Sequence, residues 1–309
     1  MTAPERGVAV VTGATGGMGR VIARTLARQG MHVVTIARTP QRAEGLRDEI
    51  GRLPGGGSLE VFAGDLSHRA GIVAATTAIR ERHGAVHLLI NNAGAHYGEH
   101  RLSADGVEMH IAVDYLAAYG MTTLLESELR RGRARVVNVA SDTLRDTRQL
   151  KLGGRPLPAT LDMNELSDLA RLNPRESFAP FEAYARAKLL TVVAGYALAR
   201  RWAGDVTVNA VHPGIVATDI IGDVMPAALR PFGGLIRRAL LTPEQGAAAA
   251  LRLATDPALR DVTGRYFVRD ADTPTPPVSY RGDVQARLRA TTDDFFFADR
   301  PRRGAAPLL

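Results

Sequence analysis

Short runs of apolar residues alternate along the chain with longer stretches in which apolar residues recur at helical spacing. The runs predict strands at residues 8–11, 32–37, 60–63, 86–91, 135–139, 206–211 and 264–268. The stretches between them predict helices at residues 17–29, 41–52, 68–83, 105–130, 181–202 and 243–255. Strands that are apolar throughout are typical of parallel sheets covered on both faces. The pattern therefore predicts an α/β fold, a single Rossmann-like, doubly wound parallel sheet with right-handed crossovers and helices on both faces.

Two regions interrupt this alternation. Residues 142–183 form a long insertion that is rich in glycine and proline, and residues 271–309 form an extension that carries TPTPP near its start. Insertions of this length in a compact fold usually have a function. We expect residues 1–270 to be one domain, with the insertion as a substrate lid. The extension should pack on that domain or remain flexible, and packing is the simpler role for its three phenylalanines, Phe295, Phe296 and Phe297.

Composition narrows the class of protein. The chain has 309 residues, 45% of them hydrophobic and 23% charged, as in an ordinary soluble enzyme. Its net charge of +7 comes from arginines spread along the whole length, which predicts neither a nucleic-acid nor a membrane partner. The absence of cysteine excludes disulfides and thiol chemistry, and we expect no metal site. No signal peptide or membrane-spanning apolar run is visible, so we expect a cytoplasmic protein.

The turn after the first strand is rich in glycine. Residues 12–19 read TGATGGMG and lead into the first predicted helix. Glycines let a backbone come close to a pyrophosphate, and the N-terminus of a helix offers unpaired N–H groups to it. The context predicts a dinucleotide site; the alternative is a tight structural turn.

The second strand ends in a residue that bears on the choice of cofactor. Folds that select NAD usually have an acidic residue there, which binds the 2′-hydroxyl of the ribose. This chain has Arg38 instead, whose planar guanidinium can hold a 2′-phosphate. We therefore predict NADP(H); the alternative is that Arg38 reflects only the high arginine content.

A tyrosine and a lysine stand four residues apart in the helix predicted at 181–202. Tyr184 and Lys188 therefore lie on one face, and Lys188 is one of only two lysines in the chain, with Lys151. A tyrosine is a useful acid or base near neutral pH when a nearby cation lowers its pKa from about 10. The alternative is an ordinary amphipathic helix with a packed tyrosine and a surface lysine.

Together these motifs resemble the short-chain dehydrogenase/reductase family. The glycine spacing is G-x-x-x-G-x-G, and the chain continues in order with Asp65-Leu66, NNAG at 91–94, Ser141 after a strand, Y-x-x-x-K, and HPG at 212–214 followed by Val216 and Thr218. Forty-two residues separate Ser141 from Tyr184, far more than family members typically have. This insertion, with the runs TPEQG and GRYFV, resembles the retinol-dehydrogenase-like branch and monomeric carbonyl reductases.

The resemblance implies a complete set of site residues. The catalytic residues would be Tyr184 as general acid/base, Lys188 lowering its pKa and binding the ribose, Ser141 orienting the substrate oxygen, and Asp114. The residues expected to contact the cofactor are Gly13, Thr15, Gly16, Met18, Gly19, Arg38, Asp65, Leu66, Asn91, Ala93, Gly94, Tyr184, Lys188, Pro213, Gly214, Val216 and Thr218.

Asp114 departs from the family pattern, which usually has asparagine at this place in a proton relay behind the lysine. An ionised aspartate accepts hydrogen bonds but donates none. A buried carboxylate near Lys188 would stabilise its ammonium and offset its effect on Tyr184. We expect activity to survive; the alternative is a slow or specialised enzyme.

The substrate is predicted only by class, as a bulky, partly apolar ketone, aldehyde or secondary alcohol. His96, Tyr97 and residues 220–240 are candidate walls of its pocket, although His96 can equally be an unimportant loop residue and the apolar side chains of 220–240 can be core. The insertion precedes the Tyr184 helix and would cover the surface through which many relatives pair, so a monomer is expected rather than a tetramer, and the alternative is a dimer. Alternatives to a reductase are a redox-neutral epimerase or dehydratase on the same fold, and a cofactor sensor without activity.

Overall fold

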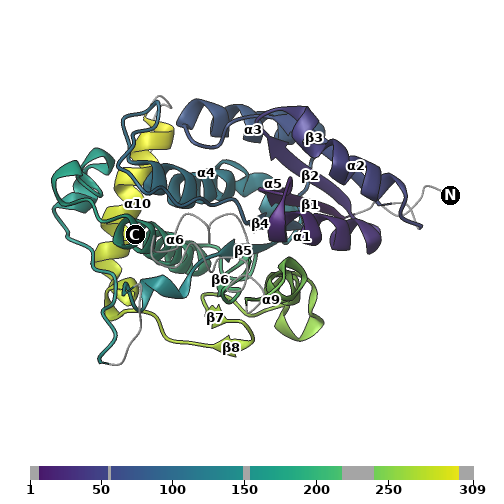
Figure 1. Cartoon of the computed structure of the whole chain (residues 1–309). Coiled ribbons are helices and arrows are strands. Elements are labelled where there is room, and N and C mark those ends of the chain that lie inside the picture. Colours follow the sequence, from purple (N-terminus) through teal and green to yellow (C-terminus); the bar gives the residue numbers. More distant parts are fainter. Residues whose placement is uncertain (1–6, 55–56, 149–153, 218–239, 299–309) are drawn as a thin grey trace, which may run out of the picture.

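The computed structural model describes residues 7–54, 57–148, 154–217 and 240–298. Its sheet has the strand order β3-β2-β1-β4-β5-β6-β7-β8, and every pair is parallel except β7 with β8 (Figure 1). The strands are β1 (Val8–Thr12), β2 (His32–Ala37), β3 (Ser58–Ala63), β4 (Leu88–Asn91), β5 (Arg135–Val139), β6 (Thr207–His212), β7 (Tyr266–Val268) and β8 (Ala271–Asp272). The Rossmann-like fold predicted from the apolar strands is confirmed, and β8 is a short addition that the sequence pattern did not indicate.

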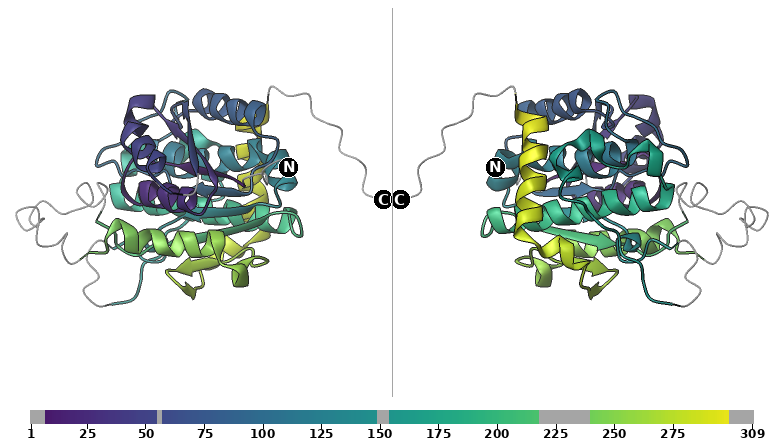
Figure 2. Two further views of the ribbon diagram at one scale, coloured as in Figure 1. Left: turned by 90° about the vertical axis from the view of Figure 1, so that its right-hand side faces the viewer. Right: turned by 90° about the vertical axis from the view of Figure 1, so that its left-hand side faces the viewer.

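Helices cover both faces of the sheet, because successive residues of each strand point in opposite directions. Ala9 and Val11 of β1 pack with α1 (Gly17–Arg28), α2 (Glu44–Gly51) and α9 (Pro243–Thr255). Val10 points to the other core, which α3 (Arg69–Arg82), α4 (Ala117–Leu124), α5 (Glu126–Arg131) and α6 (Pro180–Arg201) cover. Figure 2 shows the two helical layers on either side of the sheet.

The long helix predicted at 105–130 was wrong in its details. Gly106 adopts a left-handed φ of +74° in a turn, and Leu102 pairs with Glu108 in an isolated bridge. A π-helical segment, η2 (Ile111–Leu116), follows and runs into α4, and a break at Leu125 separates α4 from α5. Because of the turn at Gly106, the helical stretch begins later than predicted, and its first part is π-helical. Apolar spacing alone reveals neither feature.

The extension contains a helix that the sequence pattern did not predict. The short turn η9 (Pro277–Tyr280) leads into α10 (Gly282–Phe297), which packs against α6 and runs across α6 and α4 (Figure 1). Tyr115 and Tyr119 hydrogen-bond to Thr292 and Asp293 of α10, each at 2.6 Å. Phe296 is 3% exposed in the core, so the packing role expected for the three phenylalanines is confirmed for it. Phe295 and Phe297 are partly buried against the same core.

The described parts of the insertion pack on the domain through short helical turns. These are η3 (Asp142–Leu144), η4 (Glu165–Ser167), η5 (Leu169–Arg171) and η6 (Arg175–Ser177). Leu144, Leu166, Leu169 and Leu172 are buried in the core shared with α6 and α10. The Thr291 hydroxyl of α10 also donates to the Leu166 carbonyl at 2.7 Å. Chain segments more than 100 residues apart thus hold each other in place.

Candidate active site

The glycine turn lies between β1 and α1 with the geometry of an open anion site. Gly13 and Gly17 have φ values of +68° and +50°, in the left-handed region that favours glycine. Gly16 caps α1 without a side-chain hydrogen bond, and the first turn of α1 has no acidic residue. A Cβ on Gly16 would meet nothing within 4 Å. The N-terminus of α1 is therefore accessible and favourable for a pyrophosphate, so these residues fit a dinucleotide. Thr15 and Met18 are partly buried in the same turn.

Thr12 and Asn92, which the sequence analysis did not select, join this turn to the NNAG loop after β4. The Thr12 hydroxyl accepts from the backbone N–H groups of Asn92 and Ala93, both at 3.0 Å. The Asn92 side chain donates to the carbonyls of Thr12 and Gly13 at 3.0 and 3.3 Å. A Cβ on Gly19 would come within 2.2 Å of the Gly13 carbonyl oxygen. The sequence does contain a signal for this contact: Thr12 ends β1 and Asn92 follows β4, and the two strands are neighbours in the sheet.

The other residues of the NNAG loop have different surroundings. Asn91 is 4% exposed and turned inward, where its amide donates to Asn138 at 2.8 Å and to Thr122 at 3.0 Å. Gly94 borders the Tyr184 helix, because a Cβ there would lie 3.1 Å from Lys188 Nζ. Asn91 therefore connects the end of β4 to β5 and α4 through its side chain, and Gly94 allows the loop to approach Lys188.

Arg38, Asp65 and Leu66 follow two adjacent strands. Ala37 and Ala63 are register partners at the ends of β2 and β3, so the residues after them reach the same edge of the sheet. Arg38 is exposed, and Asp65 Oδ1 accepts from the Ser67 N–H at 2.9 Å. Leu66 packs partly buried against the core. The placement of Arg38 beside the glycine turn is compatible with the predicted contact to a ribose phosphate.

The loop after β6 is fixed by contacts with α9 and with Leu241. Pro213 is buried, Gly214 has a φ of +95°, and Ala217 N–H donates to the Leu241 carbonyl at 2.9 Å. Val216 meets Met18 of the glycine turn across Gly246, where a Cβ would lie within 2.4 and 2.6 Å of their side chains. Thr218 lies outside the described residues, as does nearly all of 220–240.

Ser141, Tyr184 and Lys188 come together at the carboxyl end of β5. Their exposed fractions are 8%, 8% and 3%. Lys188 Nζ donates to the Val139 carbonyl at 3.2 Å and lies 5.6 Å from the centre of the Tyr184 ring. The Ser141 hydroxyl is close enough to the Tyr184 phenol to lower the pKa of that phenol. The helical spacing of Tyr184 and Lys188 thus places both beside the serine, as expected.

The π-helical segment η2 brings Asp114 to the same place. Asp114 Oδ1 lies 3.0 Å from Lys188 Nζ and accepts from the Ala95 N–H at 3.2 Å. The Thr191 hydroxyl of α6 donates to the Asp114 carbonyl at 2.8 Å, which satisfies a backbone group in the irregular helix. Within the described residues the buried Asp114 Oδ2 has no hydrogen-bond partner. The expected proximity of this carboxylate to Lys188 is therefore observed.

These neighbours shift the pKa values of the group. Burial raises the pKa of Tyr184, the Lys188 charge lowers it, and the Asp114 charge raises it again. The net pKa of Tyr184 lies above its ordinary value, so the lowering expected from Lys188 is present but outweighed by burial and Asp114. Burial alone would lower the pKa of Lys188, but the Asp114 carboxylate holds it above its ordinary value.

A buried polar network, also missed from the sequence, lies behind Tyr184. Glu108 Oε1 accepts from His110 Nδ1 at 2.9 Å, and Glu108 Oε2 accepts from the Asn173 amide of the insertion at 2.8 Å. His110 Nε2 accepts the Tyr97 N–H at 3.0 Å, so Nδ1 carries the proton of the neutral ring. The His96 ring lies 5.8 Å from Tyr184 and 5.4 Å from His110. Burial raises the pKa of Glu108, but the hydrogen bonds that it accepts from His110 and Asn173 outweigh this and hold the pKa below its usual value.

Comparisons with known proteins agree with this geometry. A family model described as short chain dehydrogenase matches residues 7–149. The chain is 32% identical over 296 residues to polyprenol dehydrogenase of Homo sapiens, covering 92% of this chain and 83% of that protein. It is 32% identical over 271 residues to retinol dehydrogenase 14 of Mus musculus, covering 84% of this chain and 76% of that protein.

A solved structure extends the comparison. It is that of a putative NAD(P)-dependent gluconate 5-dehydrogenase from Beutenbergia cavernae with NADP bound at low occupancy. The two chains are 30% identical, with a TM-score of 0.60 over 85% of this chain and 95% of the other. The chain therefore belongs to the short-chain dehydrogenase/reductase family of oxidoreductases, in its retinol-dehydrogenase-like branch. Among the helices of the described ranges, none is both long and apolar enough to cross a membrane.

Proposed function

We propose that this oxidoreductase transfers hydride between NADPH and the carbonyl of a bulky, partly apolar ketone or aldehyde. The observation that carries the proposal is the convergence of Ser141, Tyr184 and Lys188 beside an open glycine turn. The nicotinamide supplies or accepts the hydride when the cofactor is bound. The phenol and the hydroxyl then face the substrate oxygen from the protein side.

Each residue has a separate task in the proposed reaction. Ser141 donates a hydrogen bond that orients the carbonyl oxygen, and Tyr184 gives its proton to that oxygen as the alcohol forms. Lys188 binds the nicotinamide ribose, and its charge stabilises the phenolate that remains. Because the pKa of Tyr184 lies above its ordinary value, the phenol is protonated at neutral pH. This is the state from which the phenol can donate a proton in the reduction.

The choice of NADP(H) rests on Arg38. This side chain is exposed after β2, next to the end of β3, where a guanidinium can pair with a 2′-phosphate. The NADP bound in the Beutenbergia cavernae structure supports the same choice.

The substrate class follows from the surroundings of Tyr184 and from the relatives. Aromatic rings border the phenol on the side of the insertion: His110 lies 6.1 Å from Tyr184, and Phe178 lies 6.0 Å from His110. The relatives named for polyprenol and retinol suggest a long, apolar alcohol or its aldehyde. We propose that the insertion acts as a lid on one side of this substrate.

We also propose that the protein is a monomer in the cytoplasm. Helix α10 and the insertion cover α4 and α6, with Gly120 packed so closely that a Cβ would lie 2.6 Å from Phe296. A partner subunit would have to displace α10 to reach those helices. Size-exclusion chromatography with light scattering measures the molar mass in solution and so tests the proposed monomer. A stable dimer would overturn it.

Purified protein mixed with NADPH and a panel of carbonyl compounds tests the proposed function. The panel should contain aromatic ketones, aliphatic ketones, retinal and a polyprenal, with cofactor oxidation followed by absorbance. We expect oxidation that depends on substrate and is abolished by Tyr184→Phe but retained by Tyr280→Phe, a matched change at a tyrosine that is 52% exposed. Tight NADPH binding without oxidation of any compound would favour the redox-neutral enzyme or the sensor instead.

A further inference from the structure

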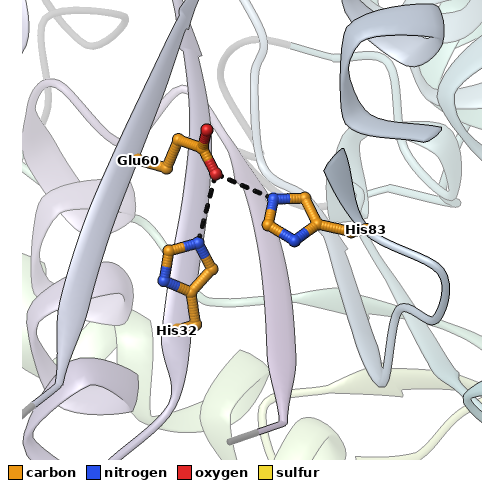
Figure 3. A group of neighbouring side chains, drawn as sticks. All are labelled: His32, Glu60 and His83. Carbon is orange, nitrogen blue, oxygen red and sulfur yellow. Dashed lines mark hydrogen bonds and ion pairs between the residues drawn. The ribbon is translucent and has the colours of Figure 1, made fainter. Parts of the chain in front are cut away.

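Two histidines and a glutamate converge on the sheet far from Tyr184. His32 is the first residue of β2, Glu60 lies within the neighbouring strand β3, and His83 follows the last residue of α3 (Figure 3). His32 is the register partner of Ser58, and Ser58 and Glu60 lie two residues apart on one face of β3. Three separate elements therefore bring these side chains together.

The three groups already have a spacing close to that of metal ligands. Glu60 Oε2 lies 2.8 Å from His83 Nε2 and 3.3 Å from His32 Nε2, and one ligand atom from each residue lies within 4.8 Å of the others. Ligand atoms of a tetrahedral zinc ion are separated by about 3.3 Å, given bonds of about 2.0 Å. Only a small separation of the two imidazole rings is needed to admit an ion.

The surroundings suit coordination by neutral imidazoles and a carboxylate. Glu60 Oε2 faces the Nε2 atoms of both histidines. Arg82 binds the other oxygen, Oε1, at 3.1 Å and is itself 68% exposed. The Ser58 hydroxyl lies 2.7 Å from His32 Nδ1 and can accept a hydrogen bond from it when Nδ1 carries the ring proton. An outer partner of this kind fixes the tautomer in which Nε2 is free to bind a metal.

The cluster is also accessible to an ion. The side chains of His32, Glu60 and His83 are 24%, 20% and 12% exposed, so water can complete the coordination. His32 begins β2, whereas Arg38 follows the opposite end of that strand, so the cluster is remote from the cofactor site. An ion here would connect the edge strand β3 to β2 and α3.

We propose that His32, Glu60 and His83 form a binding site for a divalent transition metal of the zinc class, which stabilises the β3 edge of the sheet. The ligands are His32 Nε2, Glu60 Oε2 and His83 Nε2, with water as the fourth. An imidazole that binds the metal through Nε2 carries its proton on Nδ1, so the Nε2 proton that faces Glu60 in the metal-free protein must move to Nδ1 or leave when the ion binds. Nitrogen donors favour zinc over magnesium.

The test is a calorimetric titration of the tag-free, chelator-treated full chain with Zn²⁺ alone. We expect one equivalent to bind and the melting temperature to rise, and no comparable heat with Mg²⁺. Glu60→Gln and His83→Gln should each weaken binding at least about tenfold, and Ser58→Ala about tenfold, the usual effect of losing an outer partner. His87→Gln is the matched control, since His87 lies outside the cluster and glutamine can still accept the Val8 N–H.

Failure of the wild-type chain to bind Zn²⁺ saturably would overturn the site. Equal affinity in the wild type, Glu60→Gln and His83→Gln would also overturn it, because the ion would then bind elsewhere. Circular dichroism establishes that each variant is folded. If Glu60→Gln does not fold, His83→Gln and Ser58→Ala decide the question, since each retains the carboxylate.

Discussion

Lys188 Nζ lies 3.0 Å from Asp114 Oδ1, and the two side chains are 4% and 0% exposed. The carboxylate is held by the Ala95 N–H and delivered by the π-helical segment η2. Its charge offsets that of the ammonium beside Tyr184, and it contributes to the raised pKa of the phenol. The pair therefore adjusts the pKa of the proposed proton donor, which burial raises most strongly.

Asp114→Asn should move the pH dependence of both directions to lower pH. Reduction needs the protonated phenol, so its rate falls as pH rises through the pKa of Tyr184, and oxidation, which needs the phenolate, rises there. Removing the Asp114 charge lowers that pKa, so both profiles should move to lower pH by the same amount. Profiles of kcat/KM against pH in both directions measure it.

Asp270→Asn is the control, because Asp270 is an exposed aspartate that pairs with Arg252 and contacts none of the described site residues. The same shift in both variants would count against a role for the buried pair. Asp114→Asn should keep activity within about tenfold of the wild type. A much higher turnover would instead mark the natural protein as a slow or specialised enzyme.

Arg38→Asp should change the preference between cofactors. Losing a charge-assisted hydrogen bond to a phosphate costs about 1.5–3 kcal/mol, so the Kd for NADPH should rise at least about tenfold while that for NADH changes little. Fluorescence titrations with both cofactors measure this. Arg47→Asp, a change at another exposed arginine, is the control. Equal weakening of both cofactors by Arg38→Asp would remove the basis for NADP(H).

Gly19→Ala and Gly16→Ala should separate folding from cofactor binding. A Cβ at Gly19 would lie 2.2 Å from the Gly13 carbonyl oxygen and 2.5 Å from Asn92 Nδ2, so we expect a loss of about 3 kcal/mol or more in unfolding free energy. Gly16 has open space around it, and its change should cost about 1 kcal/mol or less but weaken NADPH binding. Urea unfolding and cofactor titration give both quantities. Normal NADPH affinity in a stable Gly16→Ala would contradict a pyrophosphate at this turn.

Asn173 should be important for the stability of the insertion. Its amide donates to Glu108 and to the Ala183 carbonyl, and its backbone has a φ of +55°. Asn173→Ala loses these bonds and places a Cβ in the left-handed region, at a cost of about 2–4 kcal/mol in unfolding free energy. Asn173→Gly loses the same bonds without the strain and should be about 1 kcal/mol more stable than the alanine variant. Urea unfolding that shows the two variants to be equal would contradict the strain.

The sequence predicted the edge of the sheet where the site lies. Ser141, Asn91 and Arg38 each follow or end a strand, and parallel strands present their carboxyl ends at one edge. Tyr184 and Lys188 needed only helical spacing to share a face. The hydrogen bond from the Asn92 N–H to the Thr12 hydroxyl was not predicted, because it depends on the pairing of β1 with β4 rather than on neighbours in sequence.

The sequence by itself determined the α/β class, the glycine turn, and the tyrosine and lysine of the site, because these follow from local apolar spacing and short motifs. The tertiary structure decided which side chains and helices contact one another. Asp114 meets Lys188 through a π-helical segment, α10 covers α4 and α6, and His32, Glu60 and His83 meet across two strands and a helix. Such contacts depend on strand register and helix packing over tens to hundreds of residues, which local patterns do not specify.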